Sequence, residues 1–432
     1  MPYVTLGPDM RRQGAVGQGA PTFREIMSAS SVLKQPGLIA YLISRNVSAF
    51  ASQVQAVTVG WQIYALTHSA AALGFVGLAQ FAPMMALVFP AGHVVDQHDR
   101  RRIVIFCQFI EMCAAFAIMT ATWTGALAPW GIYALVAVFG ACRAFEMPAQ
   151  QTFLPSLVSA SDFPRASAIS SSLFQVVSIV GPSLGGVLYG LGPAVCYLVC
   201  GSAFAIAMLS TTRLQLRFPA RARQPLSLVS VFGGINFLRR KPAMLGAISM
   251  DLFAVLLGGA TALLPLYADN ILHAGPFGLG LLRAAPALGA VMMAAAMARH
   301  PLKRNAGRIM FLSVAIFGVA TIAFGLSRSV PLSVVALMVL GAADVISMVV
   351  RDALVQLGTP DEMRGRVSAV NMLFIGSSNQ LGEFESGMLA SAVGAVPAVV
   401  IGGVGTLVVT VLWMRWFPQL AALDRLDTIT AD

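Results

Sequence analysis

The stretch GHVVDQHDRRRIVIF, residues 92 to 106, places five charged residues and two histidines between two long apolar runs. The rest of the chain is unusually apolar, because 57% of its 432 residues are hydrophobic and only 11% are charged. A soluble domain of this length needs far more charge to cover its surface. We therefore interpret the charged stretch as a short loop between two helices that cross a membrane.

Apolar runs of about 20 residues recur along the chain, and a helix of that length crosses a hydrocarbon core of about 30 Å. We expect an all-α integral membrane protein with twelve transmembrane helices. The expected spans begin near Leu38, Ala70, Ile103, Pro129, Ala166, Pro193, Ala243, Phe277, Ile309, Pro331, Val367 and Val396.

One long polar break separates the sixth span from the seventh. The expected segments are a cytoplasmic N-terminal tail (1–35), an N-terminal six-helix half (36–212), a central cytoplasmic linker (213–242), a C-terminal six-helix half (243–417) and a cytoplasmic C-terminal tail (418–432). At a constant offset of 201 residues, Arg165-Ala-Ser-Ala aligns with Arg366-Val-Ser-Ala, and two glycines follow at matching places in both halves. Two six-helix pseudo-repeats are therefore expected, as in many transporters.

Basic residues are concentrated in alternate loops, among them Arg100 to Arg102 and the linker. The positive-inside rule places these loops and both termini in the cytoplasm, which predicts a multi-pass protein of a bacterial-type inner membrane. The net charge of +10 is then explained by topology and by contact with anionic lipid. We expect a monomer, with no nucleic acid as a partner.

Several spans carry polar and charged side chains at helical spacing, which indicates faces turned toward a wet interior. The residues expected in a substrate cavity or in proton coupling are Arg45, Gln55, Arg143, Glu146, Asp251, Asp344, Arg351, Glu383 and Glu385, with Glu111 and Arg283 as further charges inside spans. An ionisable side chain at the centre of a span costs roughly 3 kcal/mol on insertion scales. Each one is therefore either half of an interhelical ion pair that stabilises the fold or part of a transport site.

The sequence contains no motif of a soluble enzyme. The phosphate-binding pattern GxxxxGK[ST] is absent, as are HExxH and paired CxxC. The five cysteines lie inside apolar spans without metal-ligand spacing, so we interpret them as packing residues. No enzymatic activity, cofactor or metal is expected.

The opening stretch resembles the loop between the second and third helices of the major facilitator superfamily, whose signature is G-x-x-x-D-x-x-x-R-[KR]. The matching residues here are Gly92, Asp96, Arg100 and Arg101. In that family the loop is one part of a cytoplasmic gate held by charge pairs between the halves. We expect the other part in the turn from Thr359 to Arg366, with Asp361, Glu362, Arg364 and Arg366 as its charged members.

Two further stretches resemble a particular branch of the superfamily. Gly181, Pro182, Gly185 and Gly186 are similar to the GPxxGG core of a motif associated with antiporters. Residues 275–290 and 351–387 resemble the branch that contains the enterobactin exporter and related drug efflux proteins. The resemblance implies a secondary active exporter that is driven by the proton gradient, with the two halves rocking around a central site.

The residues leave the coupling acid and the substrate open. A coupling acid must take up a proton when it is desolvated and lose it when a cation approaches; Glu146 beside Arg143 and Asp344 beside Arg351 fit this description, and the other buried acids are reserves. The candidate cavity arginines, which are Arg45, Arg143, Arg351 and Arg283, favour an anionic, siderophore-like substrate. The 21 methionines and 25 phenylalanines favour a drug-like one. A broad multidrug efflux pump, a small-nutrient importer and a non-transporting membrane scaffold or sensor remain alternatives.

Overall fold

The computed structural model describes residues 35–159, 161–214, 228–300 and 304–424, and this part of the chain consists of helices and short connections. The N-terminal half contains α2 (Leu38–Thr67), α3 (Ala70–Gln97), α4 (Arg100–Trp123), α5 (Pro129–Gln150), α6 (Phe153–Leu157), α7 (Phe163–Gly190) and α8 (Pro193–Thr212). The remaining elements are α9 (Leu228–Arg239), α10 (Pro242–Leu257), η1 (Ala260–Leu263), α11 (Leu264–Leu266), η2 (Tyr267–Ile271), α12 (Gly275–Arg299), α13 (Ala306–Leu326), α14 (Val330–Leu357), α15 (Asp361–Val393), α16 (Ala395–Trp416) and α17 (Pro418–Ala421).

Ten segments of the described chain are long and apolar enough to cross a membrane. Two further helices, α2 and α15, have the length of a span but carry more polar side chains, and they are not among the ten. The all-α membrane fold predicted from the sequence is confirmed. The twelve-helix count remains a prediction, because it depends on these two polar helices.

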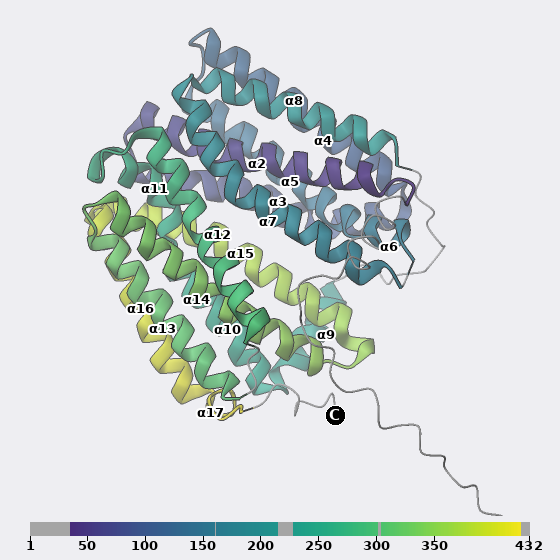
Figure 1. Cartoon of the computed structure of the whole chain (residues 1–432), viewed down its shortest axis with the longest axis vertical. Coiled ribbons are helices and arrows are strands. Elements are labelled where there is room, and N and C mark those ends of the chain that lie inside the picture. The colour runs from purple at the N-terminus through teal and green to yellow at the C-terminus, as the bar shows by residue number, and fades with distance from the viewer. Residues whose placement is uncertain (1–34, 160, 215–227, 301–303, 425–432) are drawn as a thin grey trace, which may run out of the picture.

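The two halves are arranged as repeats of one another. At the offset of 201 residues α3 corresponds to α12, α5 to α14, and α8 to α16. The packing repeats in the same way, since α3 packs against α5 as α12 packs against α14, and α2 packs against α8 as α10 packs against α16. Figure 1 shows the two bundles, one formed by α2 to α8 and the other by α10 to α17.

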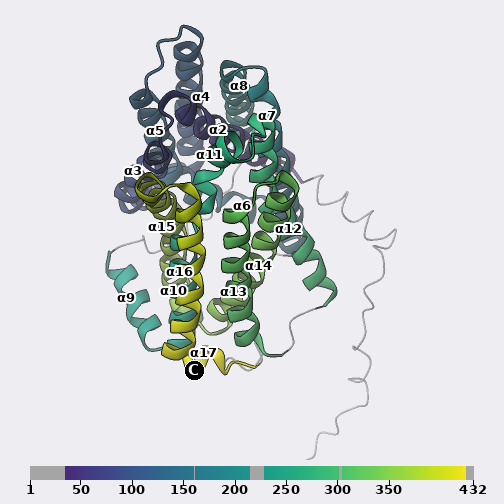
Figure 2. The same cartoon turned by 90° about the vertical axis from the view of Figure 1, so that its left-hand side faces the viewer.

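The bundles touch along two helix pairs related by the same repeat, α3 with α15 and α7 with α12. Glycines bring both pairs unusually close: a Cβ on Gly387 would lie 2.5 Å from the Cα of Gly74, and a Cβ on Gly186 would lie 2.4 Å from the carbonyl oxygen of Pro276. At the same end the Asn270 side-chain amide donates a hydrogen bond to the Tyr64 hydroxyl across the halves. In Figure 1 the bundles approach each other near α11 and diverge toward α6 and α9, and Figure 2 views the molecule from the end where they meet, with α11 between the bundles.

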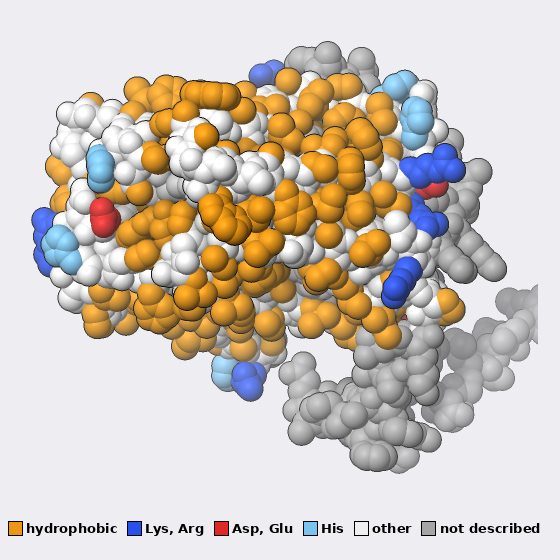
Figure 3. Space-filling model, turned by 90° about the horizontal axis from the view of Figure 1, so that it is seen from above, with side chains coloured by type: hydrophobic (Ala, Val, Ile, Leu, Met, Phe, Trp, Pro, Cys, Tyr) orange, Lys and Arg blue, Asp and Glu red, His pale blue; other side chains and the backbone are white. Residues whose placement is uncertain are grey.

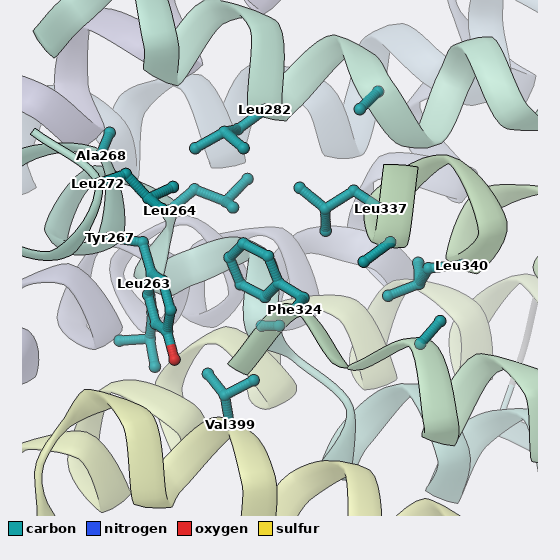
Figure 4. Packing of buried hydrophobic residues seen from close by; sticks show 14 of the residues in the cluster. Leu263, Leu264, Tyr267, Ala268, Leu272, Leu282, Phe324, Leu337, Leu340 and Val399 are labelled. Atoms are coloured by element: carbon teal, nitrogen blue, oxygen red, sulfur yellow. The ribbon is translucent and has the colours of Figure 1, made fainter. Parts of the chain in front are cut away.

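The seventh span is broken, although its apolar pattern predicts one continuous helix. α10 stops at Leu257, and the chain continues through Gly258 and Gly259 into the 3₁₀ turn η1, the short α11 and the π-helical η2. Two successive glycines weaken a helix because the backbone loses more conformational freedom when they are ordered. Packing holds the irregular part in place: the Tyr267 ring lies 4.6 Å from that of Phe324, centroid to centroid, inside the cluster shown in Figure 4.

Two segments expected as polar connections contain helices. The prediction of a turn from Thr359 to Arg366 is wrong, because α15 begins at Asp361 and most of this segment is helical. Pro360 directly precedes this helix and two acidic residues begin it, an order that suits the positive end of the helix dipole. Within the expected linker, α9 packs against α15.

The surface fits a protein embedded in lipid. Figure 3 shows one face covered mainly by hydrophobic side chains, with charged and histidine side chains mostly near its edges. Trp123 and Trp130 are 78% and 74% exposed at the end where the halves meet, and Trp416 is 63% exposed at the opposite end. Exposed tryptophans at both ends of a hydrophobic belt are typical of the two membrane interfaces.

Candidate functional site

A cavity of about 240 Å³ lies between the two halves. Its walls come from α2, α3, α4 and α5 on one side and from η1, α12 and α15 on the other. The lining residues are Ser52, Gln53, Gln55, Ala56, Val59, Gly60, Leu73, Val76, Gln80, Glu111, Val136, Phe139, Arg143, Ala262, Arg283, Gln380 and Glu383. The cavity therefore explains part of the polar character of α2 and α15, namely Ser52, Gln53 and Gln55 on α2 and Gln380 and Glu383 on α15.

Each half contributes one arginine and one glutamate to this cavity. Arg143 and Glu111 come from the N-terminal half, and Arg283 and Glu383 come from the C-terminal half. Glu383 interacts electrostatically with both arginines. Within the described part of the chain, neither arginine has a carboxylate within 4 Å or a hydrogen-bonded side chain. The two guanidinium groups can therefore bind a ligand without first breaking an ion pair.

Three buried polar atoms of the cavity walls have no hydrogen-bond partner among the described residues: Glu111 Oε2, Arg283 Nε and Gln380 Oε1. Buried polar groups in folded proteins are nearly always satisfied by protein, water or ligand. Gly60 makes room for the Arg283 guanidinium, since a Cβ on Gly60 would lie only 3.3 Å from Arg283 Nη2. The unsatisfied atoms identify the cavity as a place for a polar ligand.

Glu146 belongs to a hydrogen-bonded network beside the cavity. Its Oε1 accepts hydrogen bonds from Gln108 Nε2 at 3.1 Å and from Gln150 Nε2 at 2.6 Å. Gln108 also donates to Ser44 Oγ at 3.2 Å and accepts from Thr211 Oγ1 at 2.9 Å. The network connects α2, α4, α5 and α8, so the structure places Glu146 inside the N-terminal half, away from the cavity lining.

Arg45 also lies away from the cavity. Its guanidinium donates to Ser170 Oγ and to Tyr41 Oη, the latter at 3.3 Å, and its Cζ lies 5.4 Å from the centre of the Phe174 ring. These contacts join α2 to α7. Of the residues that the sequence proposed for a cavity, Gln55, Arg143 and Glu383 line it, whereas Arg45 bridges two helices of one half.

The charged residues of the seventh and tenth spans form a separate cluster in the C-terminal half. Asp251 on α10 and Arg351 on α14 form a hydrogen-bonded ion pair, and their side chains are 9% and 5% exposed. Asp352 lies 3.6 Å from Arg351 Nε, and Asp344 interacts electrostatically with Asp251 and Arg351. Glu385 is half-buried on α15, where Ser386 donates a hydrogen bond to it at 3.4 Å. None of these residues lines the central cavity.

The predicted gate is only partly described. Asp96 pairs with Arg100 of the same loop at 3.7 Å, and Arg101 donates hydrogen bonds to the carbonyl oxygens of Thr211 and Thr212 at the end of α8. The side chains of Asp361, Glu362 and Arg364 lie outside the described residues. Arg366 is described, and its guanidinium contacts Met363 Sδ at 3.8 Å. Pairing between the two parts of the gate stays a prediction.

The glycine motif of α7 is a packing surface. Gly181 and Gly185 lie against α2, where added Cβ atoms would be 2.7 Å from the Gln53 Cβ and 3.2 Å from the Val54 Cα. Gly186 lies against α12 in the other half. One motif thus contacts both a helix of its own half and the opposite half.

Three of the four glutamines of the cavity, Gln53, Gln80 and Gln380, were not singled out from the sequence. Arg283 was noted there as a candidate cavity arginine, and it is one of the two arginines that line the cavity. In each case the available signal was a single polar residue inside an apolar span, which costs free energy unless it faces water or protein.

Comparison with known proteins gives a consistent assignment. A family described as transmembrane secretion effectors matches residues 27–432. The enterobactin exporter EntS of Shigella dysenteriae serotype 1 (strain Sd197) is 24% identical over 411 residues, which cover 91% of this chain and 95% of that protein. The EntS protein of Escherichia coli O1:K1 / APEC gives the same figures.

Solved transporter structures have the same fold at low sequence identity. An inward-facing bacterial homologue of the iron transporter ferroportin matches with a TM-score of 0.69 and 14% identity, covering 88% of this chain and 98% of that one. The nucleoside transporter NupG matches with a TM-score of 0.63 and 15% identity, covering 88% and 99%. These similarities concern the fold alone.

Proposed function

This chain belongs to the transmembrane secretion effector family of the major facilitator superfamily, and we propose that it exports a small organic anion from the cytoplasm in exchange for protons. The observation that carries the proposal is the cavity between the halves, which Arg143 of one half and Arg283 of the other both line. A guanidinium binds carboxylates and similar planar anions through two parallel hydrogen bonds. An anion held by both arginines joins the two halves, so its binding and release are tied to their movement.

The position of Glu383 supports an anionic substrate, because the substrate would compete with this carboxylate for the two arginines. Its carboxylate interacts with both cavity arginines, which is the electrostatic role that a substrate anion would take. An entering anion competes with this internal carboxylate for the two arginines. When the anion leaves, Glu383 again supplies the negative charge beside them, so the empty site is not left with two unbalanced cations.

The end of the molecule that is closed agrees with the proposed export. At the end where the halves touch, Arg328 is the one arginine or lysine in the described loops. The basic loops lie at the other end, where the halves diverge. The positive-inside rule then supports an arrangement that is closed toward the outside and accessible from the cytoplasm, with both termini cytoplasmic. This is the state in which an exporter loads its substrate.

We favour a siderophore-like substrate. The named relatives are enterobactin exporters, and a chelator with several acidic oxygen atoms would satisfy both arginines and the unpartnered polar atoms. The cavity of about 240 Å³ is smaller than the roughly 300–1,000 Å³ of pockets that hold drug-sized ligands. A large chelator would therefore bind only when the halves move further apart.

The test is a paired metabolite profile of cells and medium under iron starvation. A strain lacking the gene is compared with strains that express the wild type, Arg283→Gln, or the control Arg328→Gln, which changes an exposed arginine outside the cavity. We expect an anionic chelator to accumulate in cells of the deletion and Arg283→Gln strains and to appear in the medium of the other two. Equal profiles in all four strains would refute siderophore export. A broadened sensitivity to unrelated toxic compounds in the deletion strain would favour multidrug efflux instead.

A further inference from the structure

A second polar site lies inside the C-terminal half, separate from the central cavity. Asp251 on α10 faces Asp344 and Arg351 on α14. Asp251 and Arg351 form a buried ion pair. Asp344 has no hydrogen bond and no cation within 4 Å among the described residues. The cluster shares no residue with the lining of the cavity between the halves.

The cluster is short of one positive charge. Asp251 and Asp344 are two carboxylates, and Arg351 is the one cation with which either of them interacts. The remaining charged neighbour is Asp352, which adds a further negative charge at 3.6 Å from Arg351 Nε and is itself 44% exposed to solvent. A buried charge without a partner is strongly unfavourable. When both aspartates are ionised, the cluster therefore needs one more cation.

A small space beside the two aspartates can hold that cation. It measures about 10 Å³, which is about the space that one water-sized particle requires, and Asp251, Asp344 and Ser347 line it together with apolar side chains. The Ser347 side chain is buried with 2% exposure, and its Oγ has no partner among the described residues. Carboxylate and hydroxyl oxygens are the ligands that hard cations prefer.

We propose that Asp251, Asp344 and Ser347 form a binding site for one monovalent cation, a proton or a sodium ion. This inference rests on the proposed antiport, because it assigns the exchanged cation to a place that the substrate does not occupy. Ser347 and the two carboxylates supply oxygen ligands to sodium, or Asp344 carries the proton and donates it to an oxygen neighbour. Either cation completes the charge balance with Arg351.

The broken seventh span connects this site to the substrate cavity. Asp251 lies on α10, and Ala262, beyond the break at Gly258 and Gly259, lines the cavity. At the break the backbone touches α15: a Cβ on Gly259 would lie 2.6 Å from the carbonyl oxygen of Gly382, the residue before Glu383. A change at the cation site can therefore reach the cavity through one short, irregular segment.

Infrared difference spectroscopy on the purified full-length protein tests the site without a substrate, so its result is independent of whether the proposed export is correct. One arm compares neutral with mildly acidic buffer, and the other adds sodium at constant pH. In the wild type we expect the C=O stretch of protonated buried carboxyl groups to appear on acidification. Asp344→Asn should remove one component of this band, whereas the components of Glu111, Glu146 and Glu383 should stay. The control Glu385→Gln changes a half-buried acid outside the cluster and should keep the Asp344 component.

The sodium arm distinguishes the two cations. Either result in the wild type supports the site, provided that Asp344→Asn abolishes the corresponding carboxyl component on acidification. Loss of this component on adding sodium assigns sodium in competition with the proton, and an unchanged component assigns the proton alone. Spectra of Asp344→Asn identical to the wild type in both arms would overturn the proposal. If that variant does not fold, Ser347→Ala replaces it: the removed hydroxyl should shift the band, and an unshifted band with an unchanged sodium response would overturn the site.

Discussion

Replacing Gly186 with alanine is expected to shift the protein away from the arrangement in which the halves touch near α11. An added Cβ would lie 2.4 Å from the carbonyl oxygen of Pro276, whereas Cβ atoms are essentially never found within 3.0 Å of another atom. The two helices must therefore separate by at least about 0.6 Å. Overpacking of this kind costs about 1–3 kcal/mol, which corresponds to a shift of the equilibrium by roughly 5- to 150-fold. The arrangement in which the halves are separated at this end lacks this contact, so the added methyl group does not destabilise it.

The assay is the distance distribution between spin labels on two exposed positions across this contact. The labels are attached to Leu191→Cys and Phe277→Cys in a background without the exposed Cys113. We expect Gly186→Ala to increase the population with the longer distance. Gly190→Ala on the same helix is the matched control, since a Cβ there would meet no atom within 4 Å. If Gly186→Ala and Gly190→Ala gave the same distribution as the wild type, the argument from close packing would be refuted.

Three further substitutions test other contacts. Tyr64→Phe removes the acceptor of the Asn270 hydrogen bond across the halves and should favour separation by about 0.5–1.5 kcal/mol, read from the same spin labels. Asp251→Asn should lower the free energy of unfolding by about 1.5–3 kcal/mol in a chemical denaturation series, because Arg351 loses its hydrogen-bonded carboxylate while Asp344 and Asp352 still balance its charge. Arg283→Gln should weaken anion binding in calorimetry by roughly 10- to 150-fold, the loss of a hydrogen bond to a charged group; equal affinity would argue against its role.

The sequence predicted the membrane fold well because the length and polarity of each span are local properties. Expected helix starts at Leu38, Ala70, Pro129 and Pro193 agree with the structure, and proline at the first helical position marks two of them. The break after Leu257 was missed because hydropathy continues through it. Only the glycine pair there indicated a discontinuity in the backbone.

The site was predictable only in part, because a helical stripe does not say which neighbour each of its residues meets. Arg143 and Glu146 were expected to share one face, and they are separated by about 60° around the helix axis. That angle is enough to place Arg143 at the cavity and Glu146 in the network with Gln108. Arg283 belongs to no stripe, so the sequence placed it beside Arg143 only by residue type, together with Arg45 and Arg351, which lie outside the cavity lining.

The exchange of an organic anion for protons through the central cavity is tested most directly by transport in liposomes that contain the purified protein. A pH gradient is imposed, and uptake of a labelled catecholate siderophore is followed for the wild type, for Arg143→Gln with Arg283→Gln, and for the control Arg328→Gln. The account predicts gradient-driven uptake by the wild type and the control, and none by the double variant. Equal gradient-driven uptake by the double variant, or no uptake of the anion by the wild type, would contradict it.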